Sequence, residues 1–100
     1  MSKETGVGWW FSASHNDPVR QELHGHSYEV VAWFKADPPR DAVVLQETLK
    51  GALRAFDHKT LSPELSRAED IARAIHSLLT DCVEVEISRP SERLRARWRP

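Results

Sequence analysis

The order of strand-like and helical patterns restricts the fold of this 100-residue chain more than any other feature. Aromatic and β-branched residues or strict alternation mark the strand-like segments, whereas apolar residues at helical spacing mark the helical ones. The strand-like segments are 8–15, 27–36, 82–88 and 93–98, and the helical segments are 43–56 and 66–79. This order predicts an α+β domain, a four-stranded antiparallel sheet with two helices on one face.

Each helical segment carries one apolar stripe that we expect to face the sheet. The stripes consist of Leu45, Leu49, Leu53 and Phe56 in the first helix, and of Ala68, Ile71, Ala72, Ile75, Leu78 and Leu79 in the second. Ser66 and Glu69 predict a capping box at the start of the second helix. In the third strand Val83, Val85 and Ile87 should share one face. Such a sheet has two open edges, which pairing with further copies of the chain would close.

Composition excludes several classes of protein. Lysine and arginine number 14 against 15 acidic residues, a net charge of −1, so neither nucleic acid nor membrane is an expected partner. No apolar run is long enough to span a membrane, and the first eight residues lack the apolar core of a signal peptide. The single cysteine, Cys82, excludes an intramolecular disulfide and fits a reducing compartment. We expect a cytoplasmic single domain over 1–100, with a flexible N-terminus at 1–7 and a basic edge strand at its C-terminus.

Three histidines predict a metal site. His24 and His26 point to the same side of a strand, whereas Gly25 between them faces the other side. His15 ends the first strand, so a hairpin would place it opposite or near this pair. The His24–His26 pair alone would favour two exposed histidines on a strand, and it is His15 that makes metal the better interpretation. Three imidazoles with one open position are typical of catalytic zinc sites, although other divalent ions also bind nitrogen ligands.

Asp57 and His58 are adjacent in a loop and form a second candidate for chemistry. A carboxylate beside an imidazole fixes its tautomer and raises its basicity. The alternative is a histidine favoured by the dipole at a helix C-terminus. His76, within the second helix, is interpreted as a surface or packing residue.

Four motifs occur in the order found in one enzyme family: FSASH at 11–15, HGHSYEV at 24–30, FDHKTL at 56–61 and AEDIARAI at 68–75. Through them nearly the whole chain resembles the 6-pyruvoyltetrahydropterin synthase and 6-carboxytetrahydropterin synthase family. The resemblance implies a T-fold in a barrel-forming homo-oligomer, usually a hexamer, with active sites at subunit interfaces. It implies Zn(II) as cofactor on His15, His24 and His26, and the pterin 7,8-dihydroneopterin triphosphate as substrate. His58 would then transfer protons and Asp57 would orient it.

The sequence departs from the family pattern at the catalytic cysteine. The position four residues before His24 holds Arg20, and Cys82 is better explained as a small core residue. One branch of the family uses a glutamate close to the HGH motif instead, and Glu22 offers one here. Glu22 is therefore a candidate general base, or else an exposed loop acid.

The glutamate that grips the pterin ring in the family has no certain counterpart either. Glu86 is closest to the family position, but it is one residue out of phase with the apolar face of its strand. Glu84 shares the face of Glu86, and Glu92 lies in the following turn.

Several functions remain open from the sequence. The first is a zinc-dependent pterin lyase, most similar to the enzyme that makes 6-carboxytetrahydropterin for queuosine and related deazapurines. A folate-type, side-chain-cleaving variant that uses Glu22 is the second. The others are a divergent protein that binds metal and a pterin or purine without turnover, and a zinc-stabilised oligomeric scaffold that needs no Asp57–His58 pair.

Overall fold

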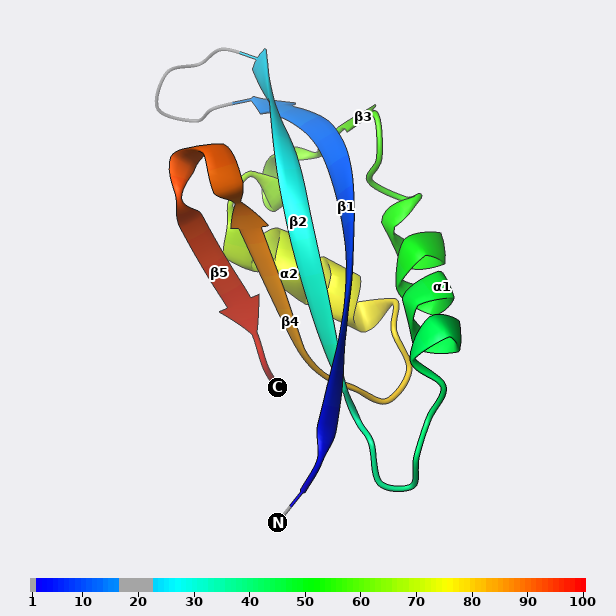
Figure 1. The fold of residues 1–100 in the computed structure, drawn as a ribbon. Helices are drawn as coiled ribbons and strands as arrows, with labels where there is room; N and C mark the ends of the chain where they lie inside the picture. Colours follow the sequence, from blue (N-terminus) through cyan, green and yellow to red (C-terminus); the bar gives the residue numbers. More distant parts are fainter. Residues whose placement is uncertain (1, 17–22) are drawn as a thin grey trace.

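A long antiparallel hairpin forms the middle of the sheet, with one helix behind the sheet and the other beside the first strand of the hairpin (Figure 1). The computed structural model describes residues 2–16 and 23–100. The elements in chain order are β1 (Glu4–Asn16), β2 (Leu23–Lys35), α1 (Ala42–Leu53), β3 (Lys59–Thr60), the 3-10 turn η1 (Pro63–Leu65), α2 (Ala68–Ser77), β4 (Cys82–Arg89), the 3-10 turn η2 (Pro90–Glu92) and β5 (Leu94–Trp98). The predicted α+β class is confirmed, and both helices share one hydrophobic core with the sheet, as predicted for helices on one face.

The sheet has five strands in the described part of the chain, in the order β3-β1-β2-β4-β5. The predicted four-stranded sheet is therefore wrong in strand number. It is also wrong in orientation, because β3 pairs with β1 in parallel while the other pairs are antiparallel. A two-residue strand has too short a pattern to stand out in a sequence. It forms here because the backbone N–H groups of His58 and Leu61 donate to the carbonyls of Ser12 and Ser14.

The first strand begins earlier than the sequence predicts. Glu4 already pairs with Lys35, so 4–7 belong to the sheet and not to a flexible N-terminus. Gly6 and Gly8 weaken the strand pattern there, since glycine is unfavourable in strands. The ring of Trp33 lies over Gly6, where an added Cβ would come within 2.8 Å of it.

The core between sheet and helices contains the apolar stripes. All four predicted positions of the first helix are buried: Leu45, Leu49, Leu53 and Phe56. α2 ends at Ser77, so the two leucines predicted for its stripe follow the helix; Leu79 is buried, but Leu78 is 53% exposed. The predicted capping box is also wrong, since Arg67 is the N-cap residue of α2 and provides no side-chain hydrogen bond.

Strand β4 contains an irregularity that changes which side chains face the core. Trp33 pairs with Glu84 but the next residue, Phe34, pairs with Cys82, so Val83 is left without a partner in the register. Cys82 therefore joins the core face with the fully buried Val85, whereas Val83 is half-buried. The predicted shared face for Val83 and Val85 is corrected by this bulge, which the sequence pattern does not signal.

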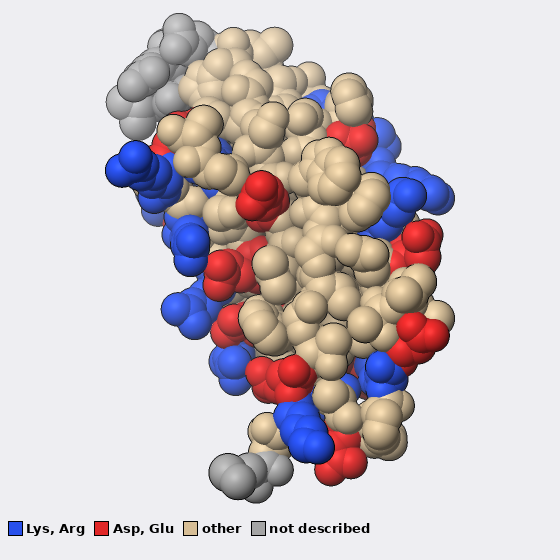
Figure 2. Space-filling view, in the orientation of Figure 1, with Lys and Arg blue, Asp and Glu red and all other residues tan. Residues whose placement is uncertain are grey.

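Basic side chains gather at the edges of the sheet face drawn in Figure 2, and acidic side chains lie closer to its middle. Figure 2 shows lysine and arginine along the β5 edge and mostly uncharged surface over β1 and β2. β5 is an edge strand, as predicted for the basic C-terminal stretch, and its neighbour Arg99 donates to Glu84 at 3.0 Å. Among the described residues, no helix combines the length and apolar character needed to cross a membrane.

Candidate metal centre

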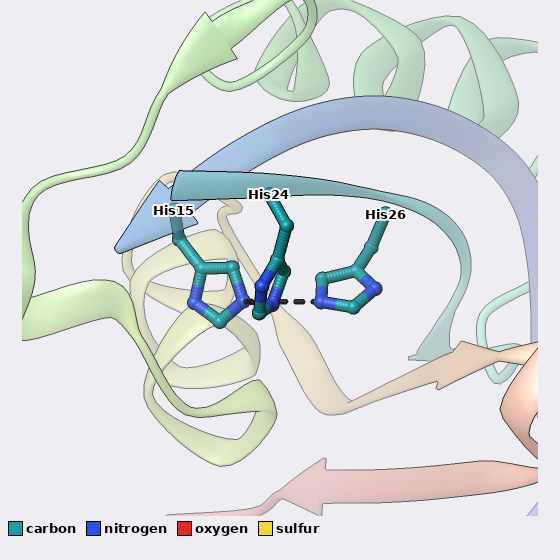
Figure 3. A group of neighbouring side chains, drawn as sticks. All are labelled: His15, His24 and His26. Carbon is teal, nitrogen blue, oxygen red and sulfur yellow. Dashed lines mark hydrogen bonds between the residues drawn. The ribbon is translucent and has the colours of Figure 1, made fainter. Parts of the chain in front are cut away.

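Three imidazoles converge at one end of the central hairpin. His15 pairs directly with His24 in the β1–β2 register, and His26 follows two residues later on the same face. The Nε2 atom of His15 lies 3.0 Å from the Nε2 atoms of both other histidines. Figure 3 shows the three rings directed toward a common point beneath the two strands. The predicted hairpin geometry is thus confirmed.

The donor set fits a single metal ion. In a tetrahedral zinc site with Zn–N bonds of about 2.0–2.1 Å, the ligand nitrogens lie about 3.3–3.4 Å apart, close to the 3.0 Å seen here. Each neutral imidazole Nε2 has either one hydrogen or one lone pair. The Nε2 of His15 therefore cannot form good hydrogen bonds with both neighbours at once, whereas a cation shared by three lone pairs satisfies all three. These histidines could together hold a metal ion.

A charged pair of side chains contacts both ring nitrogens of His26. Glu92 Oε1 lies 2.8 Å from the Nδ1 atom of His26, and Arg89 Nη1 lies 3.0 Å from its Nε2 atom. Glu92 also binds Arg89 Nη2 at 2.8 Å. Burial, followed by the positive charge of Arg89, lowers the pKa of His26, and Glu92 acts in the opposite direction.

Tyr28 completes this group from within the core. Its side chain is buried and its ring stacks on Phe11, with centroids 4.8 Å apart. Burial raises the pKa of the Tyr28 hydroxyl, while the nearby Arg89 partly offsets that effect. The hydroxyl is therefore held in its neutral form beside the charged pair.

A cavity of about 470 Å³ opens onto the three histidines. Its wall is formed by the start of α2, the end of β4 and the first residues of β5, and it includes Arg67, Arg89, Glu92 and Arg95. This volume lies within the range of small-molecule sites in proteins. The site can therefore accept a small ligand next to a metal ion.

Asp57 and His58 form the predicted pair, with Oδ2 of Asp57 3.0 Å from Nδ1 of His58. The backbone N–H of Ser12 donates to the other carboxylate oxygen at 3.0 Å, and this bond is the main reason why the pKa of Asp57 is lowered. His58 has a backbone φ of 57°, a left-handed conformation that histidine adopts more often than most residues other than glycine.

The Asp57–His58 pair and the three histidines lie at the same end of the sheet but not in one cavity. His58 borders a separate hollow with the hydroxyl side chains of Ser12, Ser14, Ser27 and Thr60. Along β1 the side chains of Ser12 and Ser14 alternate with that of His15, so this hollow opens on the opposite face of the sheet. His26 borders both hollows.

The other predicted site residues have different outcomes. Glu22 and Arg20 lie outside the residues that the structure describes. Glu86 is turned away from the three histidines and approaches Arg95 at 3.9 Å. Cys82 is buried, and burial raises the pKa of its thiol, as expected for a core residue and not for a nucleophile. His76 binds the carbonyl of Cys82 at 2.8 Å, which fits its predicted packing role.

Sequence reasoning missed Arg89 and Tyr28 and considered Glu92 only as a pterin contact. Arg89 stands two residues after the buried Ile87, so the alternation of β4 places both side chains on the inward face. This alternation was the sequence signal that could have identified Arg89. Its contact with His26 depends on the β2–β4 register, which a single sequence does not give.

One family model matches most of the chain, and a solved structure shares its fold. The family model described as "6-pyruvoyl tetrahydropterin synthase" matches residues 9–95. The structure of 6-pyruvoyl tetrahydropterin synthase from Caenorhabditis elegans has a TM-score of 0.76 and 17% sequence identity, covering 100% of this chain and 96% of that one. "Nonribosomal peptide synthetase 2" of Cochliobolus heterostrophus is 31% identical over 83 residues, which is 77% of this chain, but the chain spans only 2% of the length of that relative.

Proposed function

Because the chain belongs to the 6-pyruvoyl tetrahydropterin synthase family, we propose that it is a zinc-dependent lyase acting on 7,8-dihydroneopterin triphosphate. The product we favour is 6-carboxytetrahydropterin, the precursor of queuosine and other deazapurines. The observation that carries the proposal is the convergence of His15, His24 and His26 beside a cavity of small-molecule size.

The metal-binding residues suit a Lewis acid with an open position. When bound, Zn(II) polarises oxygen atoms of a substrate and stabilises the negative charge that develops on them. The three histidines would hold the ion from the strands β1 and β2, whose pairing fixes their spacing. The cavity wall next to them would enclose the substrate side chain.

Proton transfer is assigned to His58, with Asp57 as its positioning residue. Since Nδ1 of His58 is bonded to Asp57, Nε2 is the ring nitrogen that takes or gives a proton. The imidazole is exposed and borders the hydroxyl-lined hollow, so a substrate or a second subunit can reach it. Because this hollow and the metal-binding cavity lie on different faces, a homo-oligomer with active sites at subunit interfaces, a hexamer as in the family, would bring one chain's His58 to another's metal.

The decisive experiment incubates zinc-loaded protein with 7,8-dihydroneopterin triphosphate and follows the products by mass spectrometry. Formation of 6-carboxytetrahydropterin and acetaldehyde supports the favoured reaction, whereas a pterin with a cleaved side chain supports the folate-type alternative. A Glu22→Gln variant, assayed beside it, tests whether Glu22 replaces the family cysteine as general base. Unchanged substrate would contradict the lyase proposal.

One observation favours a second candidate, binding of a metal and a pterin or purine without turnover. Glu86, the predicted pterin contact, points away from the three histidines and toward Arg95. In this case the protein would bind zinc and a pterin, and the same assay would return the substrate unchanged.

A further inference from the structure

Two residues from the β4–β5 turn contact one of the three histidines through different ring nitrogens. Glu92 belongs to the turn η2 and Arg89 is the last residue of β4. Glu92 approaches Nδ1 of His26 and Arg89 approaches Nε2 of the same ring. Their side chains are 37% and 20% exposed, so both interactions are partly shielded from water.

Glu92 favours the tautomer of His26 that binds metal. A carboxylate only accepts hydrogen bonds, so at 2.8 Å its partner Nδ1 must carry the hydrogen. The lone pair of His26 is then on Nε2, the atom that faces the other two histidines. A carboxylate on the distal nitrogen also raises the donor strength of a metal-binding imidazole.

Arg89 acts against metal binding at the same atom. A guanidinium only donates, so Nη1 of Arg89 directs an N–H group at the Nε2 lone pair from 3.0 Å. One lone pair cannot bind both an N–H group and a metal ion. The guanidinium charge also repels a cation at the three histidines, and Arg89 has to move away from Nε2 for a metal ion to bind there.

Glu92 links the two effects. Its second oxygen binds Nη2 of Arg89 at 2.8 Å, so it can retain Arg89 near the site after the contact with His26 is broken. We propose that Glu92 and Arg89 set the metal affinity of the three-histidine site in opposite directions. Glu92 strengthens metal binding by orienting His26, and Arg89 weakens it by competing for the Nε2 lone pair. This proposal rests on the proposed function, since it requires that the three histidines bind a metal ion.

The test measures Zn(II) affinity by competition with a chromophoric chelator at one fixed pH. Glu92→Gln should weaken binding by about 10- to 100-fold, the usual effect of removing such a partner from a metal-binding histidine. Arg89→Met should strengthen binding on the order of tenfold, the equivalent of one hydrogen bond to a charged group. Glu92→Asp keeps a carboxylate and should bind more tightly than Glu92→Gln.

The matched control is Glu86→Gln, the same substitution of glutamate by glutamine. Glu86 lies in β4 on the face turned away from the histidines. This variant should leave zinc affinity unchanged. The visible absorption of bound Co(II) should change in Glu92→Gln and remain as in wild type in Glu86→Gln. Melting temperatures of the metal-free variants show whether each has folded.

The outcomes separate this inference from the proposed function. If wild type binds no metal, the metal-dependent function fails and the inference fails with it. If wild type binds about one zinc per chain, as a three-histidine site requires, but Glu92→Gln and Arg89→Met bind equally well, only the inference is overturned. A shift of both variants in the same direction would also overturn it, because a merely structural role would weaken both.

Discussion

Phe11 connects β1, the strand that carries the candidate metal ligand His15, to the loop that carries His58. Its side chain is 1% exposed. Its ring stacks on that of Tyr28 with centroids 4.8 Å apart, and the centroid of the Phe56 ring lies 5.9 Å away. Phe56 directly precedes Asp57. Replacing Phe11 by leucine keeps an apolar side chain but removes both ring pairs. We therefore expect the free energy of unfolding to fall.

The magnitude follows from the two ring contacts. Each aromatic pair contributes about 0.5–1.5 kcal/mol beyond the burial of its area, so Phe11→Leu should lose about 1–3 kcal/mol. For a domain of this size, each kcal/mol lowers the melting temperature by about 4–8 °C. The assay is urea or thermal unfolding of the metal-free protein.

The control is the neighbouring residue. Trp10 lies on the opposite face of β1 and is 60% exposed. Its ring stacks on that of Trp9 with centroids 4.2 Å apart, so Trp10→Leu should lose one aromatic pair, about 0.5–1.5 kcal/mol, and therefore less than Phe11→Leu. Equal losses for the two variants, or a loss for Phe11→Leu below about 0.5 kcal/mol, would refute the assigned faces of β1 and the linking role of Phe11.

Three further predictions concern the hollow on the other face of the sheet. A Cβ on Gly25 would lie 3.6 Å from the carbonyl oxygen of Ala13, an ordinary contact, so Gly25→Ala should keep zinc affinity and stability. Gly25→Leu should instead fill the hollow beside His58 and lower turnover without loss of zinc. His58→Ala should abolish turnover in the mass-spectrometric assay and leave the zinc content measured by atomic emission unchanged; unaltered turnover would remove His58 from the mechanism. The pKa of Asp57 is lowered chiefly by the Ser12 N–H, so the Asp57 carboxylate stabilises the fold fully above the ordinary aspartate pKa and loses this effect as the pH falls through the lowered pKa. The loss of stability caused by Asp57→Ala, measured by urea unfolding, should therefore become smaller in acid and not larger.

The face that carries the three histidines was predictable because it depends only on local pairing. A period of two places His24 and His26 on one side, and the short connection from His15 leaves little choice of partner strand. The observed pairing of His15 with His24 confirms this. The apolar stripe of α1 was predictable for a similar reason, since helical spacing is a local property.

The parts that were missed depend on contacts between distant segments. The bulge at Val83 and the contact of Arg89 with His26 both follow from the register between β2 and β4, whose paired residues are at least 48 positions apart in sequence. The early start of β1 follows from its pairing with the end of β2, where Gly6 pairs with Trp33. The spacing of apolar residues in the sequence does not show which strands pair or in which register, because side-chain packing between distant segments determines both.

The most direct test of the central claim is X-ray absorption at the zinc edge of the zinc-loaded protein, together with its zinc content. We predict about one zinc per chain with three imidazole nitrogens at about 2.0–2.1 Å, and loss of this signal in His24→Ala. Zinc bound through other ligands, or retained unchanged in His24→Ala, would contradict a metal centre built from His15, His24 and His26.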